Sequence, residues 1–86
     1  MRDRNRVFER MAQCIARALE VPLGAVVPDK SALDFDGWDS VTHTYVLLAL
    51  EQEFGTEMPI ERTLGAANLA ELAAVIADAL AKRGSV

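Results

Sequence analysis

The chain has 86 residues, 51% of them apolar and 26% charged, a composition that is typical of a globular protein and excludes a disordered chain. This length predicts a single domain, residues 1–86, that is too small to enclose an active site of its own. One cysteine, Cys14, and one histidine, His43, exclude an internal disulfide and a zinc cluster, so we expect no metal site.

The net charge of −4 is distributed unevenly along the chain. Residues 1–19 contain five arginines and two acids, residues 20–61 contain nine acids and one lysine, and residues 62–86 contain three bases and two acids. The acidic middle argues against a nucleic-acid partner and favours proteins with basic docking surfaces, although an ordinary solvated face has the same composition.

The chain also lacks the patterns of a secreted or membrane protein. No apolar segment of a signal peptide follows the arginine-rich start. The longest unbroken apolar runs, residues 45–50 and 72–77, are far too short to span a membrane. We therefore expect a cytoplasmic protein without a membrane partner, and a monomer, because one core accounts for the apolar residues.

Helical periodicity begins in the first quarter of the chain. Apolar residues recur at steps of three or four over residues 4–19, with arginines between them, and Pro22 and Gly24 follow. The pattern predicts a helix with Cys14 as a buried structural thiol. Residues 20–39 have no regular period and predict a long, packed first loop.

Three further helices are predicted after this loop. Residues 40–54 form a broad apolar helix that begins with Asp39 or Ser40 as the N-cap and ends before Gly55. Residues 57–64 allow one short turn with Pro59 near its first position. Asn68 and Glu71 have the spacing of a capping box, and the last helix follows to about residue 82. The sequence thus predicts an all-α bundle of three main helices and one short helix.

No catalytic constellation is present in the sequence. Ser40 lacks the second glycine of a hydrolase elbow, and Asp34, Asp36 and Asp39 lack the glycine and glutamate of a calcium loop. We expect a protein that is not an enzyme.

Ser40, in the stretch GWDSVTH, allows two interpretations. It is a helix N-cap, or it is an attachment point whose phosphodiester would lie at the positive end of the helix dipole. His43, one turn on, is an ordinary exposed histidine or a neighbour of that phosphate.

These residues resemble the modification motif of acyl carrier proteins. Residues 33–41, LDFDGWDSV, are similar to the family's glycine-containing loop and Asp-Ser-Leu. Residues 49–59, ALEQEFGTEMP, are similar to the end of its second helix, commonly ALEEEFxxxIP, and the stripe over residues 69–80 matches its last helix. The resemblance covers almost the whole chain.

The resemblance implies a four-helix bundle of acyl-carrier type with a 4′-phosphopantetheine arm on Ser40. A phosphopantetheinyl transferase adds the arm from coenzyme A, with Asp39 assisting recognition, and the arm carries its cargo as a thioester. An acyl or aminoacyl ligase or acyltransferase, and a downstream synthase or transferase, are the other implied partners. The resemblance places Val41, Tyr45 and Met58 at the docking surface and at the mouth of the cargo cleft. It implies a cleft lined by Leu33, Val46, Leu47, Leu50, Ile60 and Leu64.

Three departures from the family pattern guide the choice of pathway. Val41 replaces leucine, residues 42–45 contain no acid, and Trp38 precedes Asp-Ser. This resembles free-standing carriers of specialised polyketide or peptide pathways. The alternatives are an aminoacyl or D-alanyl carrier, a fatty-acid synthesis carrier, and an unmodified helical module that binds partners non-covalently.

Overall fold

The computed structural model describes residues 2–84, and every regular element in that range is helical. In chain order the elements are α1 (Arg2–Leu19), the 3₁₀ turns η1 (Leu23–Ala25) and η2 (Ala32–Asp34), α2 (Ser40–Phe54), α3 (Ile60–Leu64) and α4 (Leu69–Gly84). The predicted all-α fold with three main helices and one short helix is confirmed. Among the described residues, no helix has the length and apolarity needed to cross a membrane.

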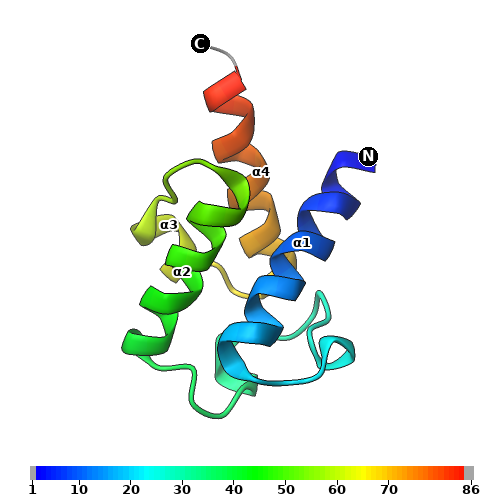
Figure 1. The fold of residues 1–86 in the computed structure, drawn as a ribbon, viewed down its shortest axis with the longest axis vertical. Coiled ribbons are helices and arrows are strands. Elements are labelled where there is room, and N and C mark those ends of the chain that lie inside the picture. Colours follow the sequence, from blue (N-terminus) through cyan, green and yellow to red (C-terminus); the bar gives the residue numbers. More distant parts are fainter. Residues whose placement is uncertain (1, 85–86) are drawn as a thin grey trace.

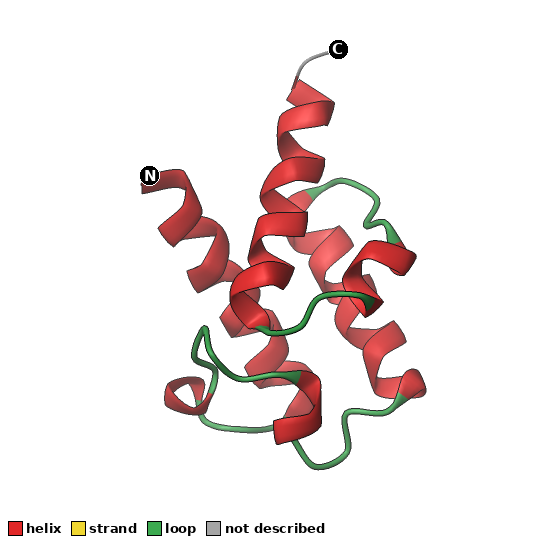
Figure 2. Cartoon of the chain, turned by 180° about the vertical axis from the view of Figure 1, so that it is seen from behind, coloured by secondary structure: helices red, strands yellow, loops and turns green. Residues whose placement is uncertain are grey.

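The three long helices pack around one core. In Figure 1, α1 runs downward and α2 runs upward beside it, while α4 runs upward behind them. Figure 2 shows the bundle from behind, with the long first loop crossing below it and α3 on the side of α2 away from α1. The most deeply buried large side chains come from all three long helices and are Met11, Ile15, Val46, Leu50, Leu69 and Ile76. Their burial supplies the main stabilisation of the bundle.

The first loop is ordered by hydrogen bonds that the sequence pattern did not reveal. The backbone N–H of Ser31 donates to the Asp34 carboxylate at 2.8 Å, which fixes η2. Backbone carbonyls of the loop also accept from the first amides of α4: Leu69 N–H donates to Lys30 at 2.8 Å, and Ala70 N–H donates to Pro28 at 3.0 Å. The loop therefore satisfies donors that the α4 terminus would leave unpaired.

Local signals define most helix ends. Asn68 accepts from the Glu71 N–H at 2.9 Å, as the capping-box spacing predicts, and the Glu71 carboxylate accepts from Ala67 N–H rather than from Asn68. Gly55 ends α2 in the left-handed region, at φ 66°. At the end of α1, Glu20 adopts a φ of 57°, which is unfavourable for a residue with a β-carbon.

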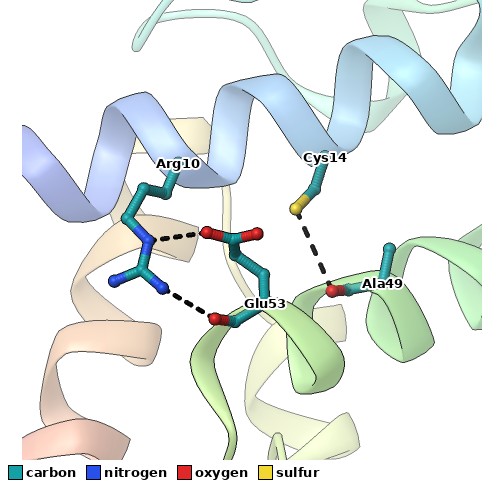
Figure 3. A network of polar contacts seen from close by, with 4 residues as sticks. All are labelled: Arg10, Cys14, Ala49 and Glu53. Carbon is teal, nitrogen blue, oxygen red and sulfur yellow. Dashed lines mark hydrogen bonds and ion pairs between the residues drawn. The ribbon is translucent and has the colours of Figure 1, made fainter.

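Arg10 links α1 to the last turn of α2. Its guanidinium donates to the Glu53 carboxylate at 2.7 Å and to the Glu53 carbonyl at 2.6 Å, as drawn in Figure 3. It also lies 4.5 Å from the centre of the Phe54 ring. In the same view the Cys14 thiol points at the Ala49 carbonyl, at 3.9 Å, and its burial agrees with the structural role predicted for it.

Candidate functional site

Asp39 is the N-cap of α2. Its backbone is extended, at φ −105° and ψ −171°, and its carboxylate accepts from the Thr42 N–H at 2.9 Å. That hydrogen bond lowers the pKa of Asp39, because it stabilises the charged form. Of the two N-cap candidates in the sequence, Asp39 takes the role.

Ser40 is consequently the first residue of α2, and its side chain is exposed. Its carbonyl accepts from the Thr44 hydroxyl at 3.0 Å, but its own hydroxyl has no hydrogen-bond partner among residues 2–84. The hydroxyl lies at the amino end of a 15-residue helix, where the unpaired amides and the macrodipole favour a negative group. This setting suits a phosphodiester on the Ser40 oxygen.

His43 is buried, with only 8% of its surface exposed, so the expectation of an exposed histidine is wrong. Its Nδ1 accepts from the Trp38 indole N–H at 3.1 Å, and its Nε2 lies 3.1 Å from the Thr63 hydroxyl oxygen. Burial lowers the pKa of His43. Its role as a phosphate neighbour stays a prediction, and it would require one of these bonds to break.

An apolar pocket of about 230 Å³ opens beside Ser40, between α2 and α3. Its lining consists of Ser40, His43, Thr44, Leu47, Leu48, Glu51, Ile60 and Leu64. A larger hollow of about 430 Å³ lies between α1 and α2, but Ser40 does not line it, and Arg17, Gln52 and Glu53 make it more polar. The smaller pocket is the one that a group attached to Ser40 reaches first.

Three of the six residues predicted to line the cargo cleft lie at this pocket, and three do not. Leu47, Ile60 and Leu64 line the pocket, whereas Val46 and Leu50 are completely buried in the core and do not reach it. Leu33 is 97% exposed on η2 and also does not line it, because the Ser31–Asp34 hydrogen bonds hold the turn with Leu33 pointing to solvent.

The predicted docking residues separate into two groups. Val41 and Tyr45 are 61% and 63% exposed, and with Leu48 they form an apolar stripe along α2. Met58 is only 4% exposed, so its side chain packs in the core and offers no docking surface. The backbone N–H of Met58 donates to the Glu51 carboxylate at 3.0 Å, which holds the chain before α3 against α2.

The sequence analysis did not predict that Thr63 contributes to the site or that His43 is buried. The burial of His43 does have a signal in the sequence. His43 belongs to the helical series that continues through Val46, Leu47, Leu50 and Phe54, and this series forms the buried face of α2. Thr63 gave no signal, because a hydroxyl on a short exposed helix is ordinary. Among residues 2–84, no three His, Cys, Asp or Glu side chains gather into a metal site.

The fold and the site together define a small helical domain that presents an exposed serine at the start of its second long element, α2. Residues 9–76 match the family model described as the phosphopantetheine attachment site. Because this match covers most of the chain, the protein belongs to that family. The residues present fit the family's cofactor, 4′-phosphopantetheine, since an exposed and unbonded Ser40 hydroxyl lies beside an apolar pocket.

Curated relatives agree with this assignment. The chain is 31% identical to the acyl carrier protein of Helicobacter pylori (strain G27) over 72 residues, which cover 84% of this chain and 92% of that protein. It is 29% identical over 55 residues to the acyl carrier protein AcpXL of Mesorhizobium japonicum and of Rhizobium etli. Those matches cover 64% of this chain and 59% and 60% of the two AcpXL proteins, so the match spans less than two thirds of their length.

Proposed function

We propose that this protein is an acyl carrier that holds acyl or aminoacyl intermediates on a 4′-phosphopantetheine arm attached to Ser40. The observation that carries the proposal is the exposed Ser40 hydroxyl, which has no partner among the described residues because Asp39 caps α2 in its place. Membership of the phosphopantetheine attachment family supports it. When bound, the arm supplies a terminal thiol that carries the cargo as a thioester.

The chain's own residues prepare the attachment. Ser40 supplies the oxygen that forms the new bond to phosphorus, and its proton passes to a base of the transferase as the nucleotide part of coenzyme A leaves. Asp39 fixes the first turn of α2 through Thr42 and presents a carboxylate to the transferase beside the reacting hydroxyl. The amides of the first turn favour the negative phosphodiester once it has formed. The chain itself catalyses no reaction.

A specialised pathway of polyketide, peptide or aminoacyl assembly is the setting that we propose for this carrier. The first acids of α2 are Glu51 and Glu53, in its last two turns, and the exposed large hydrophobic residues before them form the apolar stripe of Val41, Tyr45 and Leu48. A partner that docks on this stripe would contact an apolar surface rather than a row of carboxylates. The proposed partners are a phosphopantetheinyl transferase, a loading ligase or acyltransferase, and a downstream synthase or transferase.

The test is the intact mass of the protein after incubation with coenzyme A and a broad-specificity phosphopantetheinyl transferase. Wild type and Ser31→Ala, a control at another serine, should each gain one arm, and Ser40→Ala should gain none. Helical circular dichroism should be the same for all three. An arm on Ser40→Ala would refute the site, and a folded wild type that gains no arm would favour a non-covalent interaction module.

A further inference from the structure

Trp38 connects the segment before Ser40 to the body of α2. It directly precedes the capping residue Asp39, and its indole N–H donates to His43 Nδ1 at 3.1 Å. Its ring also lies against Phe35, with ring centres 5.7 Å apart. The position of Trp38, two residues from Ser40, therefore depends on His43.

His43 in turn connects α2 to α3. The Thr63 hydroxyl donates its proton to the Ile60 carbonyl at 2.7 Å, so its oxygen is left to accept from His43 Nε2 at 3.1 Å. With Nδ1 accepting and Nε2 donating, the ring is neutral and carries its proton on Nε2. Both His43 and Thr63 are buried, at 8% and 4% exposure, where an unsatisfied polar group is costly.

Trp38, His43 and Thr63 thus form a hydrogen-bonded bridge. Within the described part of the chain, its His43–Thr63 bond is the side-chain hydrogen bond that joins α2 directly to α3. The neighbouring polar contacts lead elsewhere: Glu51 bonds to the segment before α3, and Arg62 bonds to Asp78 of α4. His43 also lines the pocket beside Ser40, whose other wall includes Ile60 and Leu64 of α3. The same bridge thus reaches the Ser40 turn and one wall of the pocket.

We propose that Trp38, His43 and Thr63 are positioning residues: their bridge fixes the turn that presents Ser40 and holds α3 against α2 at the pocket. The proposal rests on the proposed function, in which Ser40 carries the arm. It assigns a role in that function to the neutral His43 ring, which needs no contact with phosphate.

The bridge requires a neutral ring. A second proton on Nδ1 would face the Trp38 N–H, so two donors would meet and that bond would be lost. Burial lowers the pKa of His43 from its ordinary value of 6.5, so the bridge is intact at pH 7.5 and opens at more acidic pH. The charged residues on α2, on α3 and on the segment 35–39 are Asp36, Asp39, Glu51, Glu53, Glu61 and Arg62. Four of these have partners, in Thr42, Met58, Arg10 and Asp78.

One tryptophan and one histidine make the bridge directly observable. We expect ¹⁵N spectra of the whole chain at pH 7.5 to show the His43 proton on Nε2. As the pH falls from 7.5 to 5, the Trp38 indole resonance and the Thr63 amide should shift with the same midpoint as the ring. A proton on Nδ1 at pH 7.5, or an indole resonance that ignores the titration of His43, would overturn the proposal.

Matched variants test the positioning role. Thr63→Val should speed hydrogen exchange of the α3 amides roughly 2- to 12-fold, the effect of one hydrogen bond, and Thr63→Ser should restore the wild-type rate. Trp38→Phe keeps the ring contact but removes the N–H, and should slow arm attachment to Ser40 by a similar factor. Unchanged exchange in Thr63→Val, or unchanged attachment in Trp38→Phe, would refute the proposal. If no arm joins the wild type at all, the proposed function fails, while the spectra and the exchange rates still decide whether the bridge exists.

Discussion

Replacing Arg10 with alanine should lower the free energy of unfolding by about 2 kcal/mol. Three contacts disappear together: the ion pair with the Glu53 carboxylate, the hydrogen bond to the Glu53 carbonyl, and the guanidinium over the Phe54 ring. All three join α1 to the last turn of α2.

The magnitude follows from how exposed each contact is. The Arg10 and Glu53 side chains are 46% and 34% exposed, so their ion pair is worth only about 0.5 kcal/mol. A charged donor to a carbonyl contributes more, about 1–1.5 kcal/mol here, because carbonyls of the last helical turn lack an intrahelical partner. An exposed cation–π contact adds about 0.5 kcal/mol. A loss of 2 kcal/mol corresponds to a fall in melting temperature of roughly 8–16 °C.

Urea unfolding of matched variants separates the three terms. Glu53→Gln removes only the ion pair and should cost about 0.5 kcal/mol, a cost that falls at high salt because exposed charges are screened. Arg10→Ala should keep most of its cost in salt. If the two variants cost the same, the carbonyl and ring contacts add nothing and the reasoning is wrong.

Four further predictions concern single residues. Glu20→Gly should stabilise the protein by about 1 kcal/mol in urea unfolding, since glycine adopts its φ of 57° without strain, whereas Glu20→Ala should give no such gain. Asp39→Asn keeps the cap acceptor and should make the protein less sensitive to acid. The pKa of Asp39 is lowered from its ordinary value of 3.8, so its carboxylate stabilises the fold above pH 3.8, and this contribution is lost as the pH falls further. Acid titration followed by circular dichroism should therefore show a smaller loss of stability in the variant. Cys14 should react with a thiol reagent much more slowly than a free thiol until the protein unfolds, because burial raises its pKa and covers it; equal rates in native and denatured protein would contradict this. Ile76→Ala should cost about 2–5 kcal/mol in the same urea assay, as expected for a completely buried side chain, and a cost below 1 kcal/mol would mean that the core repacks around it.

Helix positions were predictable because local signals agree with the tertiary fold. Asp39 and Gly55 bound α2 at Ser40–Phe54, and Asn68 starts α4, all within one residue of the sequence prediction. The first helix begins at Arg2 rather than at residue 4, since arginine is a good helix former. Pro59 is the N-cap of α3, directly before Ile60, which agrees with the prediction that it lies near the first position.

What the sequence could not predict depends on contacts between distant residues. The hydrogen bond from His43 to Thr63 joins residues 20 positions apart, and no local sequence pattern predicts it. Leu33 has the hydrophobicity of a core residue, yet its 3₁₀ turn points it outward. The apolar surface of α2 is so broad that periodicity alone did not decide between its buried face and the exposed stripe of Val41, Tyr45 and Leu48.

Asp39 caps α2, whereas Ser40 carries the exposed hydroxyl, and these separate roles affect which of the two residues can change during evolution. Asp39 holds the first turn of α2 whether or not anything is ever attached next to it. Under the proposed function, a descendant that lost the arm would be free to replace Ser40 with almost any helix-forming residue, but replacing Asp39 would still loosen the helix. An aspartate at this position therefore says little about whether a related chain is modified, and the residue that follows it is the one to inspect.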